Sequence, residues 1–89
     1  NFYTLPKDGN TFLFDDSSLS YPLMTRLNHD GENRFPRGTV ITLLFLVPGV
    51  SVSDSVFINT KASFTSTSHC TLVLLALDAG TWVEVSRDL

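Results

Sequence analysis

The sequence has only one cysteine and no cluster of basic residues, and each shortage excludes a class of protein. Cys70 alone cannot form a disulfide within the chain, and no spacing of cysteines and histidines resembles a zinc site. The six lysines and arginines are scattered along a chain of net charge −3, so the positive patch typical of nucleic-acid binding is missing. We therefore expect no disulfide scaffold, no metal or other cofactor, and no nucleic-acid partner.

Long apolar runs are missing as well. No window approaches about 18 apolar residues, the length of a membrane-spanning helix, so we expect no membrane insertion. The first ten residues, NFYTLPKDGN, have neither the basic start nor the apolar middle of a signal peptide. The 89 residues are enough for a single domain, and because the chain does not begin with methionine we interpret it as a fragment of a longer protein.

The third missing feature is helical periodicity. No stretch sustains apolar residues at i, i+3, i+4 and i+7, whereas β-branched and aromatic residues recur between short clusters of Gly, Pro, Asn, Asp and Ser. This pattern predicts an all-β fold, which we expect to be a small antiparallel β-sandwich resembling a jelly roll. Strands are expected over residues 2–5, 11–14, 23–27, 39–47, 50–52, 56–58, 70–77 and 81–87.

Two of the expected strands are apolar on both faces. The segments TVITLLFLV (39–47) and CTLVLLAL (70–77) do not alternate with polar residues, as a strand with one solvated face would. With no helices to cover the second face, either another copy of the chain covers it or the sandwich buries both faces itself. We expect self-association, with the interface on one face of these strands and on the only tryptophan. The expected interface residues are Ile41, Leu43, Phe45, Leu72, Leu74 and Trp82.

The last expected strand, 81–87, follows the turn residues Asp-Ala-Gly and alternates regularly. Trp82 would then cover apolar area on the face opposite Val83 and Val85, and Glu84 and Arg87 would lie at the rim. Pairing with the preceding apolar strand would hold this end of the chain in place.

We expect no catalytic activity in this chain. Asp15 and Asp16 are adjacent, so their side chains point apart and would cap a turn rather than flank a sugar bond as acid and base. His69 and Cys70 are neighbours whose side chains would leave opposite faces of a strand, and no G-x-S-x-G pattern is present. The other residues considered for acid, base or nucleophile roles are His29, Asp54, Ser66, Ser68, Asp78 and Glu84.

A polar segment, 21–37, is the best candidate for contact with a carbohydrate. It combines an aromatic residue with amide, carboxylate and guanidinium groups, which suit the apolar face and the hydroxyls of a sugar. The alternative is an ordinary solvated loop. The carbohydrate-binding candidates are Tyr21, Arg26, Asn28, His29, Asp30 and Arg34.

Four segments carry a resemblance to a known family. They are GTVITLLF at 38–45, VSDSVFI at 52–58, TLVLL at 71–75 and GTWVEVSR at 80–87. Together they resemble the small C-terminal β-domain that follows the right-handed parallel β-helix of bacteriophage tailspikes and related pectate-lyase-like proteins. The resemblance covers a little over half of the chain, and residues 1–37 take no part in it.

The resemblance implies a role in assembly. Such a domain caps the upstream β-helix of the same protein and stabilises a homotrimer that takes part in host attachment, with recognition of host polysaccharide as an alternative function. Any depolymerase activity would belong to the β-helix, so no catalytic residue is implied here. The implied location is the virion tail, outside the cell, after synthesis in the reducing cytoplasm of the host, which agrees with a single unpaired cysteine.

Overall fold

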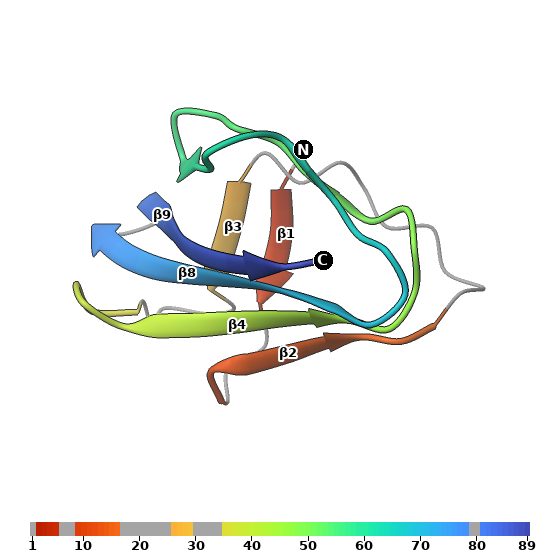
Figure 1. Ribbon diagram of the computed structural model, residues 1–89. Helices are drawn as coiled ribbons and strands as arrows, with labels where there is room; N and C mark the ends of the chain where they lie inside the picture. Colours follow the sequence, from red (N-terminus) through yellow and green to blue (C-terminus); the bar gives the residue numbers. More distant parts are fainter. Residues whose placement is uncertain (1, 6–8, 17–25, 30–34, 79–80) are drawn as a thin grey trace.

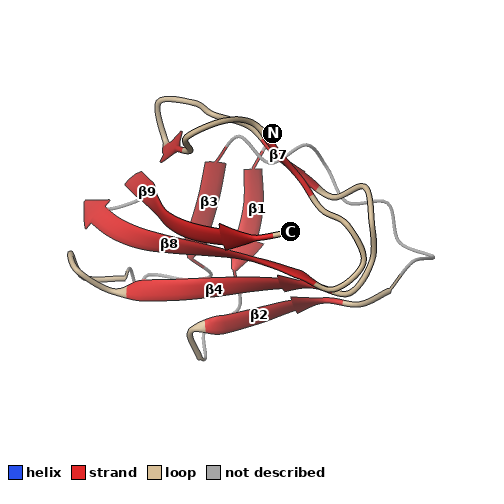
Figure 2. Ribbon diagram, in the orientation of Figure 1, coloured by secondary structure: helices blue, strands red, loops and turns tan. Residues whose placement is uncertain are grey.

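The all-β prediction is confirmed by a computed structural model of the chain. The structure describes the backbone of residues 2–5, 9–16, 26–29, 35–78 and 81–89, and the side chains of 9–16, 35–77 and 81–89. These residues contain strands, turns and loops (Figure 2) and no helix, so none that could cross a membrane. The strands are β1 (Phe2–Leu5), β2 (Thr11–Phe14), β3 (Arg26–His29), β4 (Val40–Phe45), β5 (Ser51–Val52), β6 (Ile58–Asn59), β7 (Phe64–Thr65), β8 (Cys70–Asp78) and β9 (Thr81–Asp88).

The main sheet is mixed rather than antiparallel, which corrects the expected topology. Its order is β2-β4-β8-β9-β6 (Figure 1), with antiparallel pairs β4–β8 and β8–β9 and parallel pairs β2–β4 and β6–β9. Only β8 and β9 are joined by a short turn, which forces antiparallel pairing. The strands of each parallel pair are separated by a long connection, and such a connection permits either direction.

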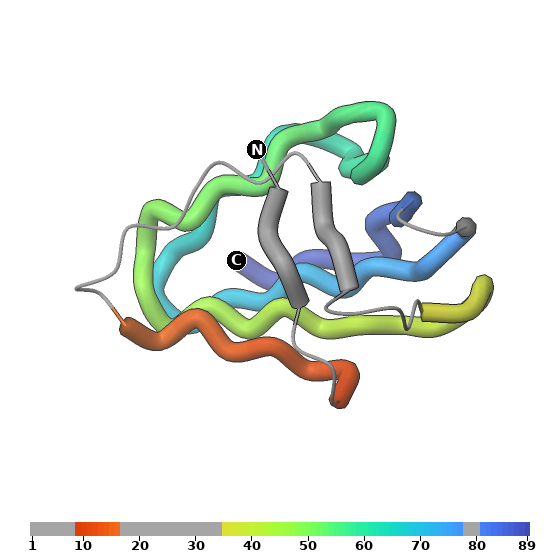
Figure 3. Tube along the Cα trace, turned by 180° about the vertical axis from the view of Figure 1, so that it is seen from behind, coloured from red at the N-terminus to blue at the C-terminus, as the bar shows by residue number. Residues whose placement is uncertain are grey.

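Two small sheets complete the fold. β1 pairs with β3 in parallel, and β5 pairs with β7 in antiparallel fashion. In Figure 1, β1 and β3 lie behind the main sheet and run across the direction of its strands. Figure 3 shows the main sheet from the other side, with β2 along β4 at its lower edge. The chain thus forms layers of crossed strands around one core, as in a β-sandwich.

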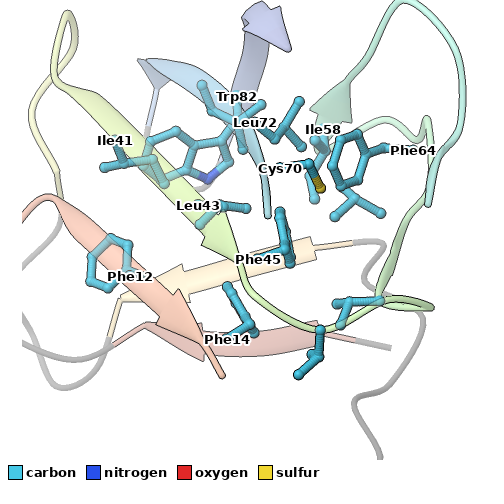
Figure 4. Close-up of a cluster of buried hydrophobic side chains, with 14 of the residues drawn as sticks. Phe12, Phe14, Ile41, Leu43, Phe45, Ile58, Phe64, Cys70, Leu72 and Trp82 are labelled. Carbon is cyan, nitrogen blue, oxygen red and sulfur yellow. The ribbon is translucent and has the colours of Figure 1, made fainter. Parts of the chain in front are cut away.

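The core lies on one face of the main sheet, which we call the inner face (Figure 4). Alternate residues of β2, β4 and β8 point inward, as the side-chain period of two requires. Phe14 stacks on Phe45 with ring centroids 4.8 Å apart, and Phe45 lies 5.1 Å from Phe64 of β7. Phe35 meets the Trp82 ring edge to face at 5.6 Å. These aromatic contacts join the small β5–β7 sheet and the segment before β4 to the main sheet.

The six residues expected at a trimer interface belong to this core. Five of them are fully buried within a single chain, and Trp82 is 2% exposed. The expected choice of face is therefore wrong: the bulkier face of the two apolar strands is covered by the chain itself, so a second copy has no access to it. The residues whose expected place at an interface is corrected are Ile41, Leu43, Phe45, Leu72, Leu74 and Trp82.

The turn at Pro48-Gly49, between β4 and β5, is held by the side chain of Ser66. The buried Ser66 hydroxyl donates to the Val47 carbonyl oxygen at 2.8 Å and accepts from the Val50 backbone N–H at 2.9 Å. Gly49 has φ 86°, a conformation that glycine adopts without steric cost, and its N–H donates to the Ser66 carbonyl at 3.0 Å. Ser66 thus satisfies buried polar groups on both sides of the turn.

Candidate functional site

The face of the main sheet opposite the core, which we call the outer face, is also apolar. Three of its side chains are half exposed: Leu13 at 50%, Val40 at 45% and Val85 at 48%. Strand pairing places Leu13 beside Leu44, and Val40 beside Leu75. The remaining aliphatic residues of the outer face are partly exposed. They are Leu44, Leu46, Val73, Leu75, Leu77 and Val83.

Charge is almost absent from the outer face. The positions between its aliphatic side chains hold threonines, such as Thr42 and Thr71. Among the described residues, charge lies only at the ends of this face: Asp88 is opposite Thr71, and Asp15 follows β2 two residues after Leu13. Depletion of charge distinguishes the centre of protein interfaces from ordinary surface. A continuous apolar sheet face is also an uncommon feature of a soluble monomer. The outer face is therefore the best candidate for contact with another protein surface.

A second notable cluster is an ion pair between Glu84 and Arg87 on the inner side of β9. Arg87 donates from Nε to Glu84 Oε2 and from Nη2 to Glu84 Oε1, both at 2.7 Å. Glu84 is buried, which corrects its expected place at the rim, and its Oε1 also accepts from the Lys61 backbone N–H at 2.9 Å. Arg87 Nη2 reaches the Ala62 carbonyl at 2.7 Å. The pair therefore fastens the segment before β7 to the last strand.

The Arg87 guanidinium controls the titration of Glu84. Its hydrogen bonds lower the pKa of Glu84 from the ordinary value of 4.5, and this effect exceeds the opposing effect of burial. The same contact raises the pKa of Arg87 above its ordinary value. Both groups are thus held in their charged forms, and a glutamate fixed as a carboxylate against an arginine is suited to a structural tie rather than to proton transfer.

The residues considered for catalysis whose side chains the structure describes make separate local contacts. Asp54 accepts the Thr60 N–H at 3.2 Å and so closes a loop. His69 is exposed and has φ 60°, while Cys70 beside it is buried, with the Thr67 N–H 3.3 Å from its sulfur. Within the part of the chain that the structure describes, no three His, Cys, Asp or Glu residues form a group that could hold a metal. Asp54 and Cys70 thus hold local loop and turn structure.

The carbohydrate-binding candidates lie where the structure gives no side-chain detail. Arg26, Asn28 and His29 belong to β3, which is described as backbone only. Tyr21, Asp30 and Arg34 lie outside the described residues. Contact with a carbohydrate therefore stays a prediction.

Sequence reasoning overlooked the outer face although the signal was present. Within the bounds of β4 and β8, threonines fall on only one of the two faces: Thr42 lies on the face of Val40 and Leu44, and Thr71 on the face of Val73. Thr39 lies just before β4. A small hydroxyl side chain tolerates water better than phenylalanine or isoleucine does. The threonines therefore mark the accessible face, and the phenylalanines mark the core.

Comparison with known proteins finds no match: no family model fits the sequence, and no curated protein or solved structure is significantly similar to it.

Proposed function

We propose that this chain is an assembly domain, the trimerising and stabilising cap of a tailspike-like attachment protein. The observation that supports this is the outer face of the main sheet, an apolar surface with almost no charge. The resemblance of residues 38–87 to tailspike C-terminal domains points to the same role. The preceding parallel β-helix of the same protein would be the neighbour of this domain, and the assembled spike would act in host attachment at a virion tail.

Burial of the outer face would supply the association energy. Complete burial of a Leu or Val side chain contributes roughly 1.5–3 kcal/mol, so the half-exposed Leu13, Val40 and Val85 would each contribute about 1 kcal/mol. The partly exposed aliphatic residues between them would add smaller amounts. Three sheets that turn this face toward a common axis would repeat every contact in each copy, because cyclic symmetry makes the contacts equivalent. These gains must exceed the loss of freedom on association.

The test compares two exposed valines. Val40 lies on the outer face and is 45% exposed, whereas Val56 lies in the loop before β6 and is 84% exposed. We expect Val40→Asp to abolish trimers in sedimentation velocity while the circular dichroism stays that of a β protein, because the charge would be buried only in the assembly. Val56→Asp should behave as the wild type. A wild-type chain that remains a folded monomer at micromolar concentration would overturn the proposal.

A further inference from the structure

The two edges of the main sheet differ in their backbone hydrogen bonding. At the β6 edge, the Phe57 carbonyl accepts from Trp82 N–H at 2.8 Å, so the N–H and C=O of Ile58 point away from β9. Both have partners: Ile58 N–H donates to Ser55 Oγ at 3.1 Å, and Ile58 C=O accepts from Ser55 N–H at 2.9 Å. Together with the bond from Thr60 to Asp54, these contacts close the edge against another strand.

The opposite edge, β2, is open. Thr42 N–H donates to the Asn10 carbonyl at 2.8 Å and Leu46 N–H to the Phe14 carbonyl at 2.9 Å, so even-numbered residues face β4. The backbone groups of Thr11 and Leu13 therefore point outward, and no partner for them is found among the residues that the structure describes. The strand, TFLF, contains no charge and no proline, the features that usually protect an edge.

We propose that β2 pairs with β2 of a second copy, antiparallel and about a twofold axis through Leu13. This register sets Leu13 opposite Leu13 of the second copy and Thr11 opposite its Asp15, so the outward N–H and C=O groups of both strands meet. The carboxylates of Asp15 and Asp16 then lie opposite the uncharged Thr11 and Asn10, which can donate hydrogen bonds to them. An axis through Asp15 would instead set like charges opposite each other.

The occupant is a second copy because the open strand is complementary to itself. A ring of edge contacts would require β2 of one copy to meet β6 of the next, and β6 is closed by Ser55 and Asp54. Only a twofold contact between open edges remains. The inference goes beyond the proposed function, since it uses the backbone edge of β2. The Leu13 side chain also lies on the outer face, so the two contacts are distinguished by their products: even-numbered species for the edge and trimers for the outer face. A trimer that also used this edge would pair with another trimer.

Substitution of Leu13 by residues of opposite charge, alone and in a mixture of the two variants, tests the register. In Leu13→Lys alone, or in Leu13→Asp alone, like charges face each other across the axis. We therefore expect the dissociation constant of the even-numbered species, measured by native mass spectrometry, to rise about 10-fold or more above that of the wild type. An equimolar mixture should restore pairing as a complex of one lysine and one aspartate chain. The matched mixture of Val56→Lys and Val56→Asp should behave as the wild type. Pairing unchanged in either single variant, or a mixture that pairs no better, would overturn the proposal.

A backbone test covers the case in which charges at Leu13 disturb folding. In the wild type, the amide hydrogens of Thr11 and Leu13 should exchange more slowly as protein concentration rises, because they become bonded to the second copy. Leu13→Pro should remove even-numbered species, since the lost N–H points out of the sheet, while Leu13→Thr keeps the N–H and should retain them. A wild-type chain without even-numbered species, or with Leu13 exchange independent of concentration, would show that the edge is unused.

Discussion

Glu84 and Arg87 are three residues apart in β9, yet their side chains meet on the same face of the sheet. Residues three apart in a regular strand point to opposite faces. The register between β8 and β9 shifts between Val73 and Leu74, which pair with Ser86 and Glu84, so Val85 has no partner across the ladder. This β-bulge turns Arg87 inward and makes the bidentate ion pair possible.

Removal of Arg87 should destabilise the fold strongly. Arg87→Ala leaves the buried Glu84 carboxylate with only the Lys61 N–H as a partner, so we expect a loss of about 3 kcal/mol in the free energy of unfolding. Urea denaturation followed by circular dichroism measures it. Arg37→Ala removes an exposed arginine and should change the value by less than about 0.5 kcal/mol. Equal effects of the two substitutions would contradict the role assigned to the pair.

The same pair should make the wild type sensitive to acid. Because Arg87 lowers the pKa of Glu84 in the folded chain, Glu84 contributes stability that is fully present above the ordinary pKa of 4.5 and is lost as pH falls toward the lower folded value. Glu84→Gln cannot titrate, so its unfolding free energy should fall less between about pH 6 and pH 3. Parallel pH profiles of the two proteins in urea denaturation would disprove this coupling.

Ser66 should contribute more stability than its neighbour Ser68. Ser66→Ala leaves the Val50 N–H without its acceptor and the Val47 carbonyl without its donor, so a loss of roughly 1–3 kcal/mol is expected in thermal or urea unfolding. Ser68 is exposed, and Ser68→Ala serves as the control with little change expected. If the two variants unfold alike, the hydroxyl does not hold the turn.

Leu43 and Leu89 provide a matched test of the core. Leu43 is fully buried, so Leu43→Ala should cost about 2–5 kcal/mol through lost burial and the cavity left behind. Leu89 is 63% exposed, and Leu89→Ala should cost well under about 1 kcal/mol. The difference in urea midpoint between the variants measures the effect. A small cost at Leu43 would mean that this face of β4 is not the core.

The sequence was a good guide to the strands and a poor guide to their partners. The ranges 2–5 and 11–14 match β1 and β2, since turn residues at Pro6 and Asp8-Gly9 separate them clearly. The third strand was expected at 23–27 and lies at Arg26–His29, where propensity is weak. Parallel pairing of β2 with β4 could not be predicted, because it depends on contacts across a long connection rather than on local residues.

The candidate surfaces were harder to predict than the strands for a similar reason. Alternation divides the residues of β4 into two apolar sets but does not say which set faces the core. Phe45 was expected at an interface between copies, whereas it lies in the core of one chain. The bulge at Val85 cannot be read from a regular alternation. The closed edge depends on Ser55 and Asp54 folding back onto β6, a contact made only in three dimensions.

The closed edge at β6 also limits growth of the sheet. Strands with two open edges can template the next chain on each side, which is how amyloid filaments extend. Among the described strands of the main sheet, only β2 has an open edge, so the proposed edge pairing would join two main sheets and then stop. We therefore expect the contacts of Ser55 and Asp54 to oppose filament growth from the β6 edge, although both residues lie in a loop and not in a strand of the main sheet.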